Sequence, residues 1–256
     1  MTGVLTIVGL GPGDARHRTP AATEAIADAE AVYGYSAYID ACADILHADQ
    51  LVVRGRMTEE KLRAEQAVEA AAGGRRVVLV SSGDAGVYGM ATLALSNAYE
   101  IEETARPEVR VLPGVTAALA ASALVGAPLA HDFACLTLSD LLTPWEEVER
   151  RLRAVADADL AIALYNPRSK GRPWQLDRAR EVLLERRAPT TPVALVADIA
   201  RDGQRVELTT LGDLDCDEVG MTTTVLVGSS TTRRFGDWLV TPRSATVDQR
   251  DGRSAG

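Results

Sequence analysis

A predicted strand, a glycine-rich loop and a predicted helix follow one another at residues 77–95, and this succession constrains the fold more than any other part of the chain. The apolar run VVLV at 77–80 is typical of a buried parallel strand. The loop SSGDAGVYGM at 81–90 carries so few large side chains that its backbone can approach another group closely. Ligands of open α/β sheets bind where strands end and such loops begin. The loop therefore predicts a small-molecule site, with a tight turn that holds no ligand as the alternative.

Composition restricts the class of protein. The chain has 256 residues, of which 46% are hydrophobic, and a net charge of −9. This length allows two domains, and the acidic balance argues against nucleic acid as a partner. The sequence has no apolar run of about 18 residues and no basic leader, so we expect neither a membrane span nor a signal peptide. Three isolated cysteines, Cys42, Cys135 and Cys216, form no metal-spaced pair and suggest a reducing cytoplasm.

The order of the predicted elements indicates two α/β domains. Strands and helices alternate up to about residue 200, after which strands predominate. We place an N-terminal α/β domain at 1–126, a C-terminal α/β domain with a mixed sheet at 127–243, and a disordered tail at 244–256.

Three threonines are predicted to cap helices. Thr19 is followed by a proline, which suits the first helical position. Thr58 is followed by two glutamates, which the helix macrodipole favours in a first turn. Thr143 begins the string TPWE, which has the spacing of a capping box.

Several familiar site patterns are absent from the sequence. The string GLGPGD at 9–14 has Asp14 where a dinucleotide fingerprint needs its third glycine, and Pro12 removes a backbone donor, so a nicotinamide dehydrogenase is disfavoured. Neither a phosphate-binding P-loop nor a serine nucleophile elbow occurs. The histidines have no metal-ligand spacing, and we expect no metal site.

Two basic clusters stand out in this acidic chain, at residues 16–18 and 168–172. Each follows a predicted strand, where loops of an α/β sheet border a cleft. Arginine and lysine side chains there suit a substrate with several carboxylates, while a solvated loop is the alternative.

Four motifs in fixed order resemble those of the tetrapyrrole methylase family, whose members transfer methyl groups from S-adenosylmethionine. The motifs span nearly the whole chain: GLGPGD at 9–14, SGDAG at 82–86, PGVTA at 113–117 and YNP at 165–167. Longer strings are similar to the branch of the family that methylates a corrin precursor and contracts its ring: GAPL at 126–129, HDF at 131–133, LSDLLTPW at 138–145 and YNPRSK at 165–170. Ala85 departs from the proline that the family usually has there.

The resemblance implies two αβα domains with the cofactor cleft between them, a homodimer, and S-adenosyl-L-methionine as cofactor, released as S-adenosyl-L-homocysteine. It also implies the residues that contact the cofactor: Leu10, Gly83, Asp84, Gly86, Val87, Thr116, Ala117, Tyr165 and Asn166. Three of them have structural alternatives: a carboxylate that caps a turn for Asp84, a helix cap for Thr116 and a core aromatic for Tyr165.

The implied substrate is a polycarboxylate tetrapyrrole. Its carboxylates would meet four basic side chains: Arg16, Arg168, Lys170 and Arg172. Ring contraction requires a proton to move, and the candidate acids and bases are His131, Asp132 and Asp140. The sequence does not decide among these three, and a purely structural role is the alternative for His131.

Other functions stay open at this point. The substrate can be metal-free or contain cobalt, as in the anaerobic route to corrins, or it can belong to another methylase of the family. A module that binds the cofactor without catalysis is a further alternative, which the basic cluster at 168–172 disfavours.

Overall fold

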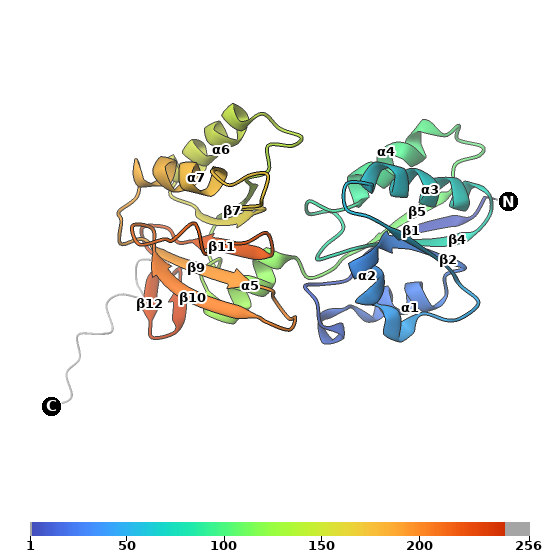
Figure 1. The fold of residues 1–256 in the computed structure, drawn as a ribbon, viewed down its shortest axis with the longest axis horizontal. Coiled ribbons are helices and arrows are strands. Elements are labelled where there is room, and N and C mark those ends of the chain that lie inside the picture. Colours follow the sequence, from blue (N-terminus) through green and yellow to red (C-terminus); the bar gives the residue numbers. More distant parts are fainter. Residues whose placement is uncertain (1, 244–256) are drawn as a thin grey trace. The chain divides into compact units, whose positions relative to one another are not determined.

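The computed structural model describes residues 2–243, and the predicted disordered tail lies outside the described residues (Figure 1). The chain forms two compact units, the first ending at Ala117 and the second beginning at Ala118. Each unit is a layered α/β structure, as the sequence predicts.

The first unit contains a five-stranded parallel sheet in the order β3-β2-β4-β1-β5. Its strands are β1 (Val4–Gly9), β2 (Ala31–Tyr35), β3 (Leu51–Gly55), β4 (Arg76–Ser81) and β5 (Glu108–Leu112). Its helices are α1 (Pro20–Ala27), α2 (Ser36–Asp40), α3 (Glu60–Ala72) and α4 (Ala91–Glu100), with short 3₁₀ turns η1 (Ala15–His17) and η2 (Ala43–Ile45).

Helices cover both faces of this sheet (Figure 1). Alternate strand side chains point to opposite faces, so Ile7 and Leu79 pack with α3 and α4, whereas Val8 and Val80 pack with α1 and α2. Helices α3 and α4 contact each other, and the buried side chains of both are largely alanine, which allows the close approach.

The second unit contains a mixed five-stranded sheet in the order β10-β9-β11-β8-β7, in which β7 and β8 are parallel and the other pairs are antiparallel. Its strands are β7 (Phe133–Thr137), β8 (Ala161–Tyr165), β9 (Pro192–Ala197), β10 (Arg205–Thr210) and β11 (Thr223–Val227). Helices α6 (Trp145–Asp157) and α7 (Gln175–Leu184) cover one face and enclose the main core of this unit.

The other face carries helix α5 (Ala117–Val125) and a small sheet that the sequence did not predict (Figure 1). This sheet consists of β6 (Gly126–Ala127), β12 (Arg233–Phe235) and β13 (Trp238–Val240). The predicted boundary after residue 126 assigned α5 to the first domain, but all of α5 except its first residue belongs to the second unit. The reason is that β6, which follows α5 directly, pairs with β13.

The predicted helix caps are only partly correct. Thr19 does cap α1, because its side chain accepts from the amide of Ala22 at 3.1 Å. Thr58 does not cap α3: it has a φ of 74°, and the residue before the helix is Glu59. Helix α6 begins one residue later than the capping box requires, so Pro144 occupies the N-cap and makes no side-chain cap bond.

Within residues 2–243, no helix combines the length and the apolar character that crossing a bilayer needs. In the same range, no three His, Cys, Asp or Glu side chains gather into a group that could hold a metal ion.

Candidate functional site

Three loops meet at the carboxyl edge of the first sheet. Strand β1 lies between β4 and β5 and runs parallel to both. The loops that follow these strands, at residues 10–14, 82–90 and 113–116, are therefore neighbours at the edge where open α/β sheets bind ligands. All three belong to the four motifs that carry the family resemblance.

The glycines of these loops let the loops pack against one another. Gly11 and Gly83 exchange backbone hydrogen bonds of 3.0 and 2.8 Å. A Cβ atom on Gly114 would lie 2.1 Å from the carbonyl oxygen of Gly83, and one on Gly9 would lie 2.6 Å from the same oxygen. The sequence predicted that a ligand would approach this bare backbone. At Gly9 and Gly114, however, the backbone of a neighbouring loop makes the close approach.

Asp84 connects two of the loops through its carboxylate. One oxygen, Oδ1, accepts from the amide of Gly86 at 2.8 Å, and the other, Oδ2, accepts from the amide of Gly114 at 2.9 Å. The carboxylate therefore caps its own turn, as the structural alternative proposed, and also holds the loop after β5. Each oxygen keeps a second lone pair with which it can accept a further bond.

The remaining predicted cofactor residues of the first unit differ in accessibility. Leu10 is only 6% exposed and packs in the core beneath α1 and α2, which leaves its side chain little surface for a ligand. Gly86 is exposed, whereas Val87, Thr116 and Ala117 are partly buried. The structure brings Thr116 beside Gly83, since a Cβ on that glycine would lie 3.7 Å from the Cα of Thr116.

The buried Ala85 fills the position where the family usually has proline. It is 1% exposed, and its carbonyl accepts from the amide of Ala91 at 2.9 Å at the start of α4. Burial and this bond hold the turn in place without the ring of a proline.

In the second unit, the parallel strands β7 and β8 end at a common edge. Tyr165, the last residue of β8, accepts a hydrogen bond through its hydroxyl from the amide of Ala118 at 2.8 Å and so secures the first turn of α5. Asn166 has a left-handed φ of 52° and donates from Nδ2 to Oγ1 of Thr137, the last residue of β7, at 3.0 Å. The two residues are therefore fixed by contacts within their own unit.

Two of the four predicted substrate anchors are already engaged inside the protein. Arg168 pairs with Asp217 at 2.5 Å and Asp177 at 3.4 Å. Arg172 is only 7% exposed and donates to the carbonyl of Asn166 at 2.9 Å. A substrate carboxylate would have to break these contacts, so the structure does not present either guanidinium as a free anchor.

The other two predicted anchors are exposed. Lys170 lies in the loop after β8 with its side chain in solvent. Arg16, in the first unit, is 84% exposed and pairs with Asp14 at 2.8 Å. The hydrogen bonds from Arg16 lower the pKa of the Asp14 carboxyl to about 2.

The structure does not bring the three candidate acids and bases together. His131 and Asp132 are exposed residues just before β7 begins, whereas Asp140 lies beyond its other end. A five-residue strand spans roughly 16 Å, so His131 and Asp132 lie at the opposite edge of the sheet from Asp140.

Asp140 has a partner that the sequence analysis missed. The side-chain Nε2 of Gln175, the first residue of α7, donates to Oδ2 of Asp140 at 3.1 Å. Gln175 is 1% exposed, and in the described part of the chain its Oε1 has no hydrogen-bond partner. The available signal in the sequence was a polar residue at the start of the amphipathic helix α7.

Comparison with known proteins identifies the family. The sequence matches the family description "Tetrapyrrole (Corrin/Porphyrin) Methylases" over residues 4–215. The chain belongs to this family and is a carbon methyltransferase of it. The family resemblance drawn from the four motifs is thus confirmed.

Several relatives align with almost the whole chain. A precorrin-3B C(17)-methyltransferase from Sinorhizobium sp is 44% identical over 250 residues, which are 95% of this chain and 97% of the relative. A probable cobalt-factor III C(17)-methyltransferase from Salmonella typhimurium strain LT2 is 43% identical over 244 residues, which are 95% of this chain and 100% of the relative. A cobalt-factor III methyltransferase from Priestia megaterium is 43% identical over 249 residues, but the matched part is 45% of that longer protein.

Among solved structures, that of the methyltransferase CobJ matches with a TM-score of 0.89 and 42% identity, covering 94% of this chain and 100% of CobJ. A uroporphyrin-III C-methyl transferase from Thermus thermophilus, complexed with S-adenosyl homocysteine, has a TM-score of 0.68 at 22% identity and covers 88% of this chain and 97% of that one. The first match confirms the predicted two-domain tetrapyrrole methylase fold.

Proposed function

We propose that this enzyme methylates C17 of a corrin precursor, either precorrin-3B or its cobalt-containing counterpart, with contraction of the ring in cobalamin biosynthesis. The observation that carries the proposal is the match over 95% of the chain to relatives named for that position, at 43% and 44% identity. The two relatives are named for different substrates and are almost equally similar, so identity does not favour one of the two.

We propose S-adenosyl-L-methionine as the methyl donor. When bound, it supplies a methyl group on a sulfonium that is already activated for displacement. The loops at 82–90 and 113–116 suit such a ligand because Asp84 holds them together and because they carry few large side chains. The cofactor contacts we expect in the first unit are at Gly83, Gly86, Val87, Thr116 and Ala117. The amides of Gly83, Gly86 and Val87 already donate within the loops, so these three residues would offer carbonyl oxygens or van der Waals contact. The solved relative with bound S-adenosyl homocysteine supports the choice of cofactor.

The contribution of the chain to the reaction is then mainly orientation. Holding the reacting atoms in line converts a bimolecular step into an effectively unimolecular one and can supply several kcal/mol of the barrier. Asp84, Tyr165 and Asn166 serve this by fixing loops and helix ends, whether or not they also touch the cofactor.

Lys170 is the basic residue best placed to bind a substrate carboxylate, because its side chain is exposed. Arg16 is also exposed, but a substrate carboxylate would have to compete with Asp14 for its guanidinium. Arg168 and Arg172 would support the loop that carries Lys170 through their internal contacts. Asp140 is our candidate for moving the proton during ring contraction. Of the three candidates, Asp140 is the one that lies after β7, at the same edge of the sheet as Tyr165 and Asn166.

We further propose that the protein acts as a homodimer in a reducing cytoplasm. The homodimer follows from the resemblance, and the compartment from three cysteines that form no disulfide within residues 2–243. Light scattering on the purified protein, with and without reductant, tests both: a monomer, or a dimer held by a disulfide, would contradict the proposal.

The experiment that tests the function offers both substrates to the enzyme. Purified protein is incubated with S-adenosyl-L-methionine and either precorrin-3B or cobalt-factor III, and the product is analysed by mass spectrometry and NMR. We expect a gain of one methyl group at C17 and a contracted ring with one of the two. Binding of S-adenosyl-L-homocysteine without turnover of either substrate would favour the non-catalytic alternative.

The substrate anchor has a matched control, because Lys61 is the only other lysine of the sequence. Lys170→Ala should raise KM for the tetrapyrrole several-fold, as expected when one charged hydrogen bond is lost. Lys61→Ala, on the exposed face of α3, should leave KM unchanged. Equal effects of the two substitutions would remove Lys170 from the site.

A further inference from the structure

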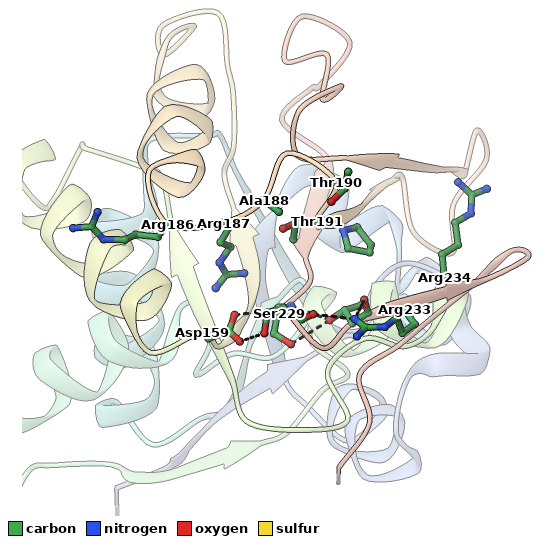
Figure 2. Close-up of a pocket in the computed structure, with 12 residues that line it drawn as sticks. Asp159, Arg186, Arg187, Ala188, Thr190, Thr191, Ser229, Arg233 and Arg234 are labelled. Carbon is green, nitrogen blue, oxygen red and sulfur yellow. Dashed lines mark hydrogen bonds between the residues drawn. The ribbon is translucent and has the colours of Figure 1, made fainter. Parts of the chain in front are cut away.

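A cavity of about 420 Å³ lies in the second unit at the amino ends of β8 and β9 (Figure 2). Its lining includes Thr191, which precedes β9, and Ser229, which follows β11 by two residues. Tyr165 stands at the other end of β8, roughly 16 Å away along the strand. The cavity is therefore separate from the loops that follow β7 and β8.

The lining of this cavity is strongly basic. It contains four arginines, five serine or threonine residues and one carboxylate; the arginines are Arg186, Arg187, Arg233 and Arg234. The chain as a whole carries a net charge of −9, so such a local excess of positive charge requires an explanation.

Within residues 2–243, carboxylates neutralise little of this charge. Arg186 points away from the other arginines and pairs with Asp157 at 2.7 Å (Figure 2). Arg233 donates instead to two backbone carbonyls, at 2.9 and 3.2 Å, and Arg234 donates to the carbonyl of Gly236 at 2.9 Å. Carbonyl partners satisfy donors but leave the net charge unbalanced.

The one carboxylate of the lining is occupied. Asp159, in a left-handed conformation with φ of 52°, accepts from both the amide and the hydroxyl of Ser230. These two bonds engage both of its oxygens in holding the loop after β11, but they leave its negative charge in place. That one charge faces the three guanidinium groups of Arg187, Arg233 and Arg234, so the lining keeps an excess of positive charge.

Arg187 is the most buried of the four arginines, at 7% exposed. Its guanidinium donates to the carbonyls of Gly228 and Leu160, and its Nε has no hydrogen-bond partner among residues 2–243. Burial lowers the pKa of this guanidinium below its usual value. The charge of Asp159 acts on this pKa in the opposite direction but does not outweigh burial. A buried cation that is only partly compensated is costly, and a bound anion would relieve that cost.

The loop that carries the hydroxyl groups is held firmly in place. The amide of Ser229 donates to Oγ1 of Thr232 at 2.8 Å, and this hydroxyl lies 2.8 Å from Oγ1 of Thr241. Thr241 in turn donates to the carbonyl of Pro128 at 2.6 Å. This chain of bonds fixes the wall before any ligand arrives, which reduces the entropy cost of binding.

We propose that this cavity binds a small oxyanion, as a phosphate or carboxylate group of a metabolite. Guanidinium groups are the preferred partners of both kinds of oxyanion, and hydroxyl groups add neutral donors. The volume exceeds what a single inorganic ion needs and lies in the range of small-molecule pockets. The site does not depend on the proposed methyl transfer.

The test measures anion binding to the full-length protein in a buffer free of phosphate and carboxylates. Calorimetric titrations use inorganic phosphate, glycerol 3-phosphate and citrate, with glycerol as the neutral control. We expect saturable binding of at least one anion below about 10 mM and none of glycerol. The tightest of the three identifies the source of the oxyanion. No saturable binding of any anion in this range would overturn the proposal.

Two substitutions locate the bound anion. Arg233→Ala removes an exposed side chain that donates to two backbone carbonyls of its own loop, and we expect about tenfold weaker binding. Arg205→Ala removes the same charge from the exposed start of β10 and should leave binding unchanged. Circular dichroism verifies that both variants fold. Unchanged binding in Arg233→Ala, or equal weakening in both variants, would contradict the proposed site.

Discussion

The carboxylate of Asp84 offers a direct test of how the three loops of the first unit are held together. It accepts from the amides of Gly86 and Gly114 at 2.8 and 2.9 Å. Asp84→Ala removes both acceptors, and Asp84→Asn keeps one carbonyl oxygen but turns the other acceptor into a donor. We therefore expect the wild type to be the most stable, the asparagine variant to be intermediate and the alanine variant to be the least stable.

The magnitude follows from the surroundings of the two amides. A hydrogen bond to a charged group contributes about 1.5–3 kcal/mol when it is shielded from water. Gly86 is exposed, so water can replace the carboxylate at its amide, whereas Gly114 is partly buried. We expect a loss of about 2–3 kcal/mol for Asp84→Ala and about 1 kcal/mol for Asp84→Asn, mostly from the bond to Gly114.

The chain provides an internal control for this measurement. All three tryptophans, Trp145, Trp174 and Trp238, lie in the second unit. Tryptophan fluorescence during urea unfolding thus monitors the second unit, and amide hydrogen exchange at Gly114 monitors the loop junction in the first. A loss of 2 kcal/mol corresponds to roughly 30-fold faster exchange.

Two results would refute this reasoning. If Asp84→Ala changed the free energy of unfolding of the first unit by less than about 0.5 kcal/mol, the change would be no larger than that of an ordinary surface substitution. If the Gly114 amide exchanged at the wild-type rate in that variant, the carboxylate would not be its partner in solution.

Three further predictions concern other parts of the structure. Gly114→Ala should destabilise the first unit by about 1–3 kcal/mol in urea unfolding, because its Cβ would lie 2.1 Å from a backbone oxygen. A Cβ on Gly171 would meet no atom of residues 2–243 within 4 Å, so Gly171→Ala should be neutral. Tyr165→Phe should cost about 1 kcal/mol in the same assay, since the first-turn amide of α5 loses its 2.8 Å acceptor; no change would mean that water replaces the hydroxyl. Glu149, whose pKa falls to about 2 through hydrogen bonds led by that from Arg178, should stabilise the protein above pH 4.5 and lose this effect as the pH falls towards 2. Glu149→Gln should therefore be about 1 kcal/mol less stable at pH 7 and equal to the wild type near pH 2, in unfolding experiments across that range.

Local patterns were sufficient to predict most of the strands and helices. The run at 77–80 lies within β4, and the helix expected after the glycine-rich loop is α4, which begins at Ala91. These predictions succeed because buried strands need continuous apolar residues and because glycine and proline interrupt them. The β12–β13 hairpin was missed because its three-residue strands are too short to show a period.

The candidate site was predictable as a set of loops but not as a set of side-chain roles. The motifs placed the loops after β1, β4 and β5 because a parallel sheet brings strand ends to one edge. The engagement of Arg168 with Asp217, 49 residues away, leaves no local trace in the sequence. The same is true of the burial of Leu10 and of the contact between Gln175 and Asp140.

The sequence by itself determined the family, the two α/β layers and the glycine-rich loops, because these depend on local conformation and on the order of short motifs. The tertiary structure decided what each loop residue contacts. It showed that the bare backbone of Gly9 and Gly114 accommodates another loop, that Asp84 joins two loops, and that Arg172 is buried. It also assembled the arginine-lined cavity from segments about 70 residues apart. Contacts of this kind depend on which strands are neighbours, and only the folded sheet establishes that.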